Sequence, residues 1–224
     1  MKRSEINAIL RDAVAFIDKM NFKLPPFAYW SPEEWAEKGH EYDEIRDNML
    51  GWDITDFGHG DYEHLGLLLF TLRNGNYKIK KYAKPYAEKI LLVGVGQVTP
   101  CHFHWSKTED IINRGGGELV IEVFNSTPEG GLADTDVEIH QDGRSYLVPA
   151  GSLVRLSPGE SISIQTGMYH RFWADGERVL VGEVSMVNDD VADNRFYLEM
   201  GRFPSVEEDE PALYLLGNEY PQAK

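Results

Sequence analysis

The sequence of 224 residues contains a single cysteine, Cys101, and no long apolar run. One cysteine cannot form an intramolecular disulfide, which excludes the disulfide framework of a small secreted domain. The N-terminus lacks the apolar core and cleavage site of a signal peptide. No segment approaches the roughly 20 apolar residues that span a bilayer. We therefore expect a cytoplasmic protein that does not enter a membrane.

Basic residues are also few, because 22 lysines and arginines stand against 37 aspartates and glutamates, a net charge of -15. Nucleic acids and anionic membranes bind basic patches, so neither is expected as a partner. A small neutral ligand or a metal ion remains compatible with this charge. The apolar share of 42% is typical of a globular protein rather than a disordered one.

Helical periodicity is confined to the first part of the chain. Apolar residues recur at helical spacing over residues 6–20, and Ser4 is placed to cap that helix. The segment "SPEEWAEKG" predicts a second helix that is capped by Ser31 and ends near Gly39. We expect residues 1–65 to form a helical extension packed on the rest of the molecule.

Residues 66–200 carry short strand-like runs separated by turn signals. "GLLLFTLRNGNYKIKKYA" predicts a hairpin around Asn74–Gly75, and "GGG" at 115–117 and "DG" at Asp142 and Asp175 predict further turns. Many short antiparallel strands favour a β-barrel of the jelly-roll type. Residues 201–224 are expected to form an irregular or short helical extension, so that the whole chain makes one structural domain.

The segment "PCHFHWSKTEDIINRGGG", residues 100–117, concentrates side chains that bind metals. His102 and His104 are two residues apart, so they would share one face of a strand. Glu109 has the wrong parity for that strand, but a turn across residues 105–107 would return it to the same side. His170, at the head of a later strand, could supply a further imidazole. Imidazoles and a carboxylate favour a transition metal.

The spacing of these residues resembles the two motifs of the cupin superfamily. Gly96, His102, His104, Glu109 and Gly116 follow the first motif. The second motif is similar to the segment from Gly159 through Gly167 to His170, with Gln165 in place of the usual proline and Ala174 in place of the usual asparagine. The resemblance implies a mainly β cupin jelly-roll barrel that binds one divalent metal through His102, His104, Glu109 and His170.

Two longer strings are more specific. "AEKILLVGVGQVTPCHFHWSKTEDIINRGGGELVIEVFNS" and "VGEVSMVNDDVADNRF" resemble the D-lyxose isomerase family of cupin-type sugar isomerases, and the similarity runs from about residue 1 to residue 204. It implies a metal-dependent aldose–ketose isomerase that interconverts D-lyxose and D-xylulose, and also D-mannose and D-fructose. Four protein ligands leave two positions of an octahedral metal for sugar oxygens, which favours manganese(II) over closed tetrahedral zinc.

Several other side chains could take part in such a reaction. Glu183 shares its parity with Val179 and Val181 and is the candidate base, whereas Lys107 could donate to a substrate oxygen. The alternatives for these two are an outward-facing glutamate and a solvated loop lysine. Candidates for binding the sugar are Lys89, Asp190, Asp193 and Arg195, although the last three could instead hold a loop.

Two other functions are compatible with a cupin barrel. The first is an iron(II) dioxygenase, which uses similar ligands but usually has an apolar substrate pocket. The second is a non-catalytic sugar-binding cupin, which often lacks some of the ligands kept here. The expected partners are a small sugar and a second copy of the chain, because exposed sheet edges favour a homodimer.

Overall fold

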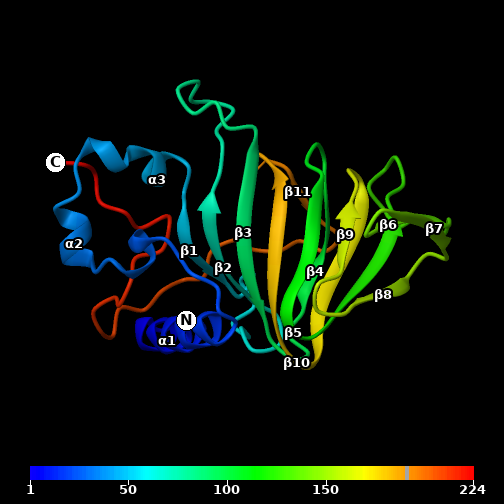
Figure 1. The fold of residues 1–224 in the computed structure, drawn as a ribbon, viewed down its shortest axis with the longest axis horizontal. Coiled ribbons are helices and arrows are strands. Elements are labelled where there is room, and N and C mark those ends of the chain that lie inside the picture. Colours follow the sequence, from blue (N-terminus) through cyan, green and yellow to red (C-terminus); the bar gives the residue numbers. More distant parts are fainter. Residues whose placement is uncertain (190–191) are drawn as a thin grey trace.

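The computed structural model describes residues 1–189 and 192–224 (Figure 1). Its helical elements are α1 (Arg3–Lys19), α2 (Pro32–Ala36), α3 (Asp43–Asp47) and the 3-10 turns η1 (Pro26–Tyr29) and η2 (His40–Tyr42). Its strands are β1 (Gly51–Thr55), β2 (Leu67–Arg73), β3 (Tyr86–Val93), β4 (Thr99–His104), β5 (Glu109–Asn125), β6 (Val137–Gln141), β7 (Arg144–Val148), β8 (Ser152–Leu156), β9 (Ser161–Ile164), β10 (Met168–Met186) and β11 (Asn194–Phe196). The predicted mainly β, jelly-roll architecture with an N-terminal helix is confirmed.

Two long strands, β5 and β10, close the barrel by pairing on both sides along their length. The second half of β10 lies between β3 and the first half of β5, which continues to β9. The first half of β10 lies between β4 and the second half of β5, which continues to β8. A strand that bends in this way belongs to two layers, so the layers face each other across an enclosed space.

Glycines at the bend explain why two predicted turns are absent. The "GGG" run lies inside β5 and the "DG" at Asp175 lies inside β10, where the register between the strands shifts. Gly115 and Gly116 have φ values of 147° and 105°, which favour glycine. They act as a kink in a continuous strand rather than as a loop. By contrast, Asp142–Gly143 forms the predicted turn between β6 and β7.

The hairpin predicted at Asn74–Gly75 is wrong. β2 does pair with the next strand, but residues 74–85 form a long connection and the return strand starts only at Tyr86. No residue of the run "YKIKKYA" is buried, and its three lysines favour solvent, so local alternation did not become a strand. The cap of α1 also differs, because the helix starts at Arg3 and Glu5 accepts a hydrogen bond from the backbone N–H of Lys2 at 2.7 Å. The second helix ends at Ala36, before Gly39.

The apolar core is divided into two parts by the sheet of β1, β2 and β3. One part fills the barrel and includes Leu67 and Leu69, whereas Leu68 and Phe70 of the same strand face outward. α1 covers that outer face with its apolar stripe (Figure 1). Both faces of β2 are therefore buried, which explains its continuous apolar sequence. Since β1 pairs with β2, the sheet already begins within the segment assigned from the sequence to the helical extension.

Candidate active site

Three histidines meet inside the barrel. His102 and His104 project from the same face of β4, and His170 of β10 is the cross-strand partner of His102. One ring nitrogen of each histidine can be chosen so that all three lie within 4.8 Å of one another. All three side chains are buried, with exposed fractions of 8%, 3% and 0%. The period-two alternation of β4 thus brings the His-x-His pair together as the sequence predicted.

Hydrogen bonds fix the protonation of two of these rings. Nδ1 of His102 lies 2.8 Å from the carbonyl oxygen of Pro100, and Nδ1 of His170 lies 3.1 Å from that of Met168. A carbonyl only accepts, so Nδ1 carries the proton and Nε2 presents a lone pair. Burial, together with the neighbouring histidines, also holds the pKa of His102 well below its usual value. These features are typical of imidazoles that bind a metal.

Buried nitrogen atoms in this cluster make no well-aligned hydrogen bond among the described residues, although the Glu109 carboxylate lies 3.2–3.3 Å from two of them. They are Nε2 of His170 and both ring nitrogens of His104. A buried polar atom without a partner costs roughly 1–3 kcal/mol, so such an arrangement needs a ligand to be stable. A cation bound by imidazole nitrogens would satisfy Nε2 of His104 and of His170, and the donor set fits a divalent transition metal.

The carboxylate of Glu109 lies beside the histidines, as the turn after β4 allows. Its two oxygens are 3.3 Å from Nε2 of His104 and 3.2 Å from Nε2 of His170. Nζ of Lys107 is 2.7 Å from Oε2. Burial alone would raise the pKa of Glu109, but Lys107 and His104 outweigh it and hold that pKa well below its usual range. The side chain is therefore an ionised carboxylate within reach of a metal at the histidines.

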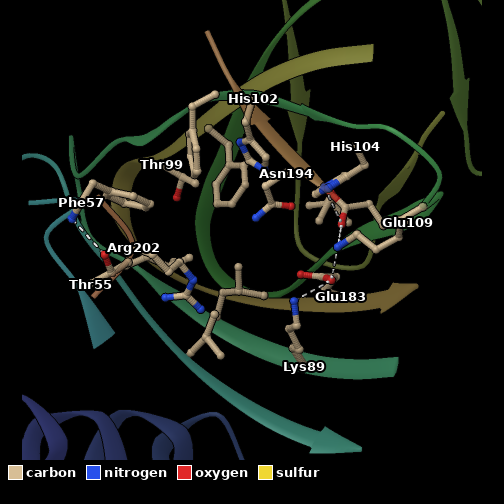
Figure 2. A pocket seen from close by; sticks show the side chains of 17 residues that line it. Thr55, Phe57, Lys89, Thr99, His102, His104, Glu109, Glu183, Asn194 and Arg202 are labelled. Carbon is tan, nitrogen blue, oxygen red and sulfur yellow. Dashed lines mark hydrogen bonds and ion pairs between the residues drawn. The ribbon is translucent and has the colours of Figure 1, made fainter. Parts of the chain in front are cut away.

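A second buried carboxylate, Glu183, is held between two lysines (Figure 2). Its Oε1 lies 3.0 Å from Nζ of Lys107 and 3.2 Å from Nζ of Lys89, which stands opposite Glu183 on β3. Oδ1 of Asn188 accepts hydrogen bonds from the same two ammonium groups, at 2.7 Å from Lys89 and 3.1 Å from Lys107. The carboxylates of Glu109 and Glu183 and the ammonium groups of Lys89 and Lys107 thus form a compact network in which the charges balance.

One cavity connects the network with the histidines. It spans about 560 Å³ when the open space at its mouth is included, of which about 60 Å³ is room for the centres of water-sized molecules. Its walls combine these charged groups with apolar side chains (Figure 2). The lining residues outside the network are Thr55, Phe57, Leu67, Leu69, Leu91, Thr99, Ile111, Phe172, Asn194, Phe196 and Arg202.

The candidate sugar-binding residues lie in different places. Lys89 lines the cavity. Asp193 lies beside the turn between β4 and β5, where its carboxylate accepts from the backbone N–H groups of Ser106 and Lys107 at 2.8 and 3.1 Å. Arg195 is exposed and does not line the cavity. Side chains alternate along β11, so its neighbours Asn194 and Phe196 face the cavity and Arg195 faces away. Asp190 lies outside the described residues.

Sequence reasoning missed polar residues of this region: Thr55, Thr99, Asn188, Asn194 and Arg202. Asn194 could have been found, since it directly precedes Arg195 in the recognised string and pairs with His104 across β11 and β4. Arg202 follows the last strand in a segment without periodicity, so no local pattern marks it.

Comparisons with known proteins identify the family of the chain. The sequence model of the D-lyxose isomerase family matches residues 1–220. The chain belongs to the D-lyxose isomerase family. It is 50% identical to the D-lyxose/D-mannose isomerase of Serratia proteamaculans, over 98% of both chains. It is equally identical to the enzyme of that name from Escherichia coli O157:H7, over 99% of both. The chain is therefore a sugar aldose–ketose isomerase, as the resemblance implied, and these matches favour neither the dioxygenase nor the non-catalytic alternative.

Solved structures of L-ribose isomerases share the fold. A mutant enzyme from Acinetobacter sp. DL28 in complex with L-ribose has a TM-score of 0.61 at 14% identity, over 92% of this chain and 98% of that one. The ligand-free enzyme of Cellulomonas parahominis has a TM-score of 0.57 at 17% identity, with the same coverage. At such identities the similarity supports the barrel alone. Within the described residues, no helix is both long and apolar enough to cross a membrane.

Proposed function

We propose that this family member interconverts D-lyxose with D-xylulose and D-mannose with D-fructose. The observation that carries the proposal is a buried histidine cluster that shares one cavity with a carboxylate held between two lysines. The names of its relatives at 50% identity support the choice of sugars. D-lyxose and D-mannose have the same configuration from C2 to C4 and differ in chain length.

The residues proposed to hold a divalent metal, manganese(II) by preference, are His102, His104, Glu109 and His170. Mixed imidazole and carboxylate ligands suit this ion. When bound, it would act as a Lewis acid toward the oxygens on C1 and C2 of the open-chain sugar.

Glu183 is proposed as the base that moves the proton between the two carbons. Its carboxylate would take the proton from C2 of the aldose and return it to C1, while a proton passes from the C2 hydroxyl to the C1 oxygen. Lys107, which touches both Glu183 and Glu109, is placed to donate to one of these oxygens. Lys89 on the opposite side would keep the Glu183 carboxylate oriented and could also contact the sugar.

Two further residues would act through these groups. Asn188 is proposed to position both lysines, because its amide oxygen accepts from each of them. Asp193 is proposed to hold the turn that carries Lys107, through the N–H groups of Ser106 and Lys107, rather than to bind sugar. A role for Asp190 in sugar binding stays a prediction.

The decisive experiment joins metal analysis with a ketose assay on free pentoses and hexoses. Protein loaded with manganese should convert D-lyxose and D-mannose, and chelation should abolish the activity until metal is restored. His104→Ala should remove the bound metal and leave a folded barrel. Full activity in protein shown to be free of metal would overturn the metal proposal, whereas inactivity of the loaded protein on every aldose would overturn the substrate proposal.

We also propose a homodimer in the cytoplasm. Large apolar side chains that are at least half exposed support the dimer, among them Trp105, Leu147, Leu153 and Leu198. Light scattering at micromolar concentration should give twice the chain mass of 25.5 kDa. A mass of one chain would contradict the dimer.

A further inference from the structure

The cavity has two chemically different ends. His104, Glu109 and Glu183 lie at one end, and Thr55, Phe57 and Arg202 lie toward the other (Figure 2). Phe57 at this end packs edge-on against Phe196, whose ring also lies 5.4 Å from that of His102. Further apolar residues that line the cavity are Leu67 and Leu69. A sugar whose C1 and C2 sit beside the histidines would direct its remaining hydroxyl groups toward this far end, where apolar side chains cannot bind them.

Arg202 supplies a charged group at that end. It comes from the segment after β11 rather than from a barrel strand, and it is only 21% exposed. Asp53 of β1, itself 18% exposed, forms an ion pair with the guanidinium through Nη1 and Nη2. Burying such a pair contributes little to stability compared with apolar packing. A fixed planar guanidinium with five N–H donors is, however, well suited to bind hydroxyl oxygens.

Arg202 also separates the cavity from a second one. The second cavity spans about 1080 Å³ when the open space at its mouth is included, and its lining contains the polar residues Asp53, Thr71, Asn74 and Asn188. Among the residues that the structure describes, Arg202 is the one side chain that lines both cavities. A sugar chain that extends toward this end of the first cavity would therefore approach the Arg202 guanidinium.

We propose that Arg202, oriented by Asp53, binds the hydroxyl groups at the far end of the open-chain sugar and thereby sets the preference for chain length. The inference rests on the proposed function, because it assumes that C1 and C2 lie at the histidine end. It assigns Arg202 to substrate binding and Asp53 to positioning, and gives neither a part in proton transfer.

The test compares sugars of different length in Arg202→Met, which keeps the size of the side chain and removes its donors. L-erythrose has the C2 and C3 configuration of D-mannose but ends at C4. In the variant, the KM for D-mannose should rise about tenfold to hundredfold, as expected for losing hydrogen bonds from a charged donor. The inhibition constant of L-erythrose against D-mannose turnover should change less than about twofold, because it lacks the far hydroxyls.

Two matched variants complete the design. Arg202→Lys keeps the positive charge beside Asp53 but lacks the planar guanidinium with its several N–H donors. The variant should therefore fold normally and still bind D-mannose more weakly. Arg155→Met removes an exposed arginine that pairs with Glu118 and Asp175, and it should leave every constant unchanged. The inference is overturned if the KM for D-mannose is the same in Arg202→Met as in the wild type. It is also overturned if the inhibition constant of L-erythrose rises by the same factor as that KM. Wild-type protein that converts no aldose would instead contradict the proposed function.

Discussion

At the scale of single residues, the reaction depends on how Glu183 is held. Both Lys89 and Lys107 contact the same oxygen, Oε1, and their common partner Asn188 fixes them in turn. A carboxylate oriented through one oxygen can present the other to a substrate carbon. The arrangement distinguishes Glu183 from Glu109, whose two oxygens both face histidine nitrogens.

Replacing Glu183 by glutamine should therefore separate chemistry from binding. The amide keeps the shape of the side chain but cannot accept the C2 proton, so turnover should fall about 10²–10⁴-fold while bound metal stays at the wild-type level. Exchange of the C2 hydrogen with deuterated water, followed by NMR, should be lost in parallel. Glu88→Gln, on the same sheet but paired with Arg73, is the control and should retain full activity. Wild-type turnover in Glu183→Gln would exclude it as the base.

The sequence predicts residues of this site only where a local rule applies. His102 and His104 follow from strand alternation, and Glu109 follows from the turn after β4. Asn188 and Arg202 could not be predicted in this way, since their roles arise from partners 81 to 149 positions away along the chain. Arg195 lies in a recognised string, but its strand turns it outward, and its role in sugar binding stays a prediction.

At the scale of elements, the bend shared by β5 and β10 shapes the cavity. Local sequence could not reveal it, because "GGG" and "DG" are equally typical of a loop and of a kinked strand. At Gly116 a Cβ atom would lie 1.9 Å from the carbonyl oxygen of Arg178. That distance is far too short for any contact, so the two strands would have to separate.

Gly116→Ala should consequently destabilise the protein by about 2–4 kcal/mol, the sum of the φ strain and the strand displacement. Gly143→Ala is the matched control. Gly143 also has a positive φ, 80°, but a Cβ there would meet nothing within 4 Å. It should cost only about 1 kcal/mol. Urea unfolding measures both, and equal losses would show that backbone strain alone explains the effect.

At the scale of the whole molecule, the two ends of the chain are joined on one side of the barrel (Figure 1). Arg3 of α1 is 3% exposed, and its Nη2 lies 2.7 Å from Oε1 of Glu208 and 2.6 Å from Oε1 of Glu219. The backbone N–H of Arg3 also donates to the carbonyl oxygen of Glu207 at 2.8 Å. The helix thus anchors the final segment, which carries Arg202 into the cavity. The N-terminal helix is in this sense part of the site, although it contributes no side chain to it.

Arg3→Met should loosen this anchor. Removing the cation leaves Glu219 partly buried without its partner. The free energy of unfolding should therefore fall by about 2–3 kcal/mol. This loss is smaller than for a fully buried pair, because Glu208 is 61% exposed. Lys23→Met, which removes the exposed pair with Asp18, should change nothing measurable. Because Arg202 would then be less firmly placed, the KM for D-mannose should rise in Arg3→Met while the bound metal and the C2 exchange persist. If metal content and exchange fell together with binding, the ends of the chain would be supporting the whole barrel rather than the far end of the cavity.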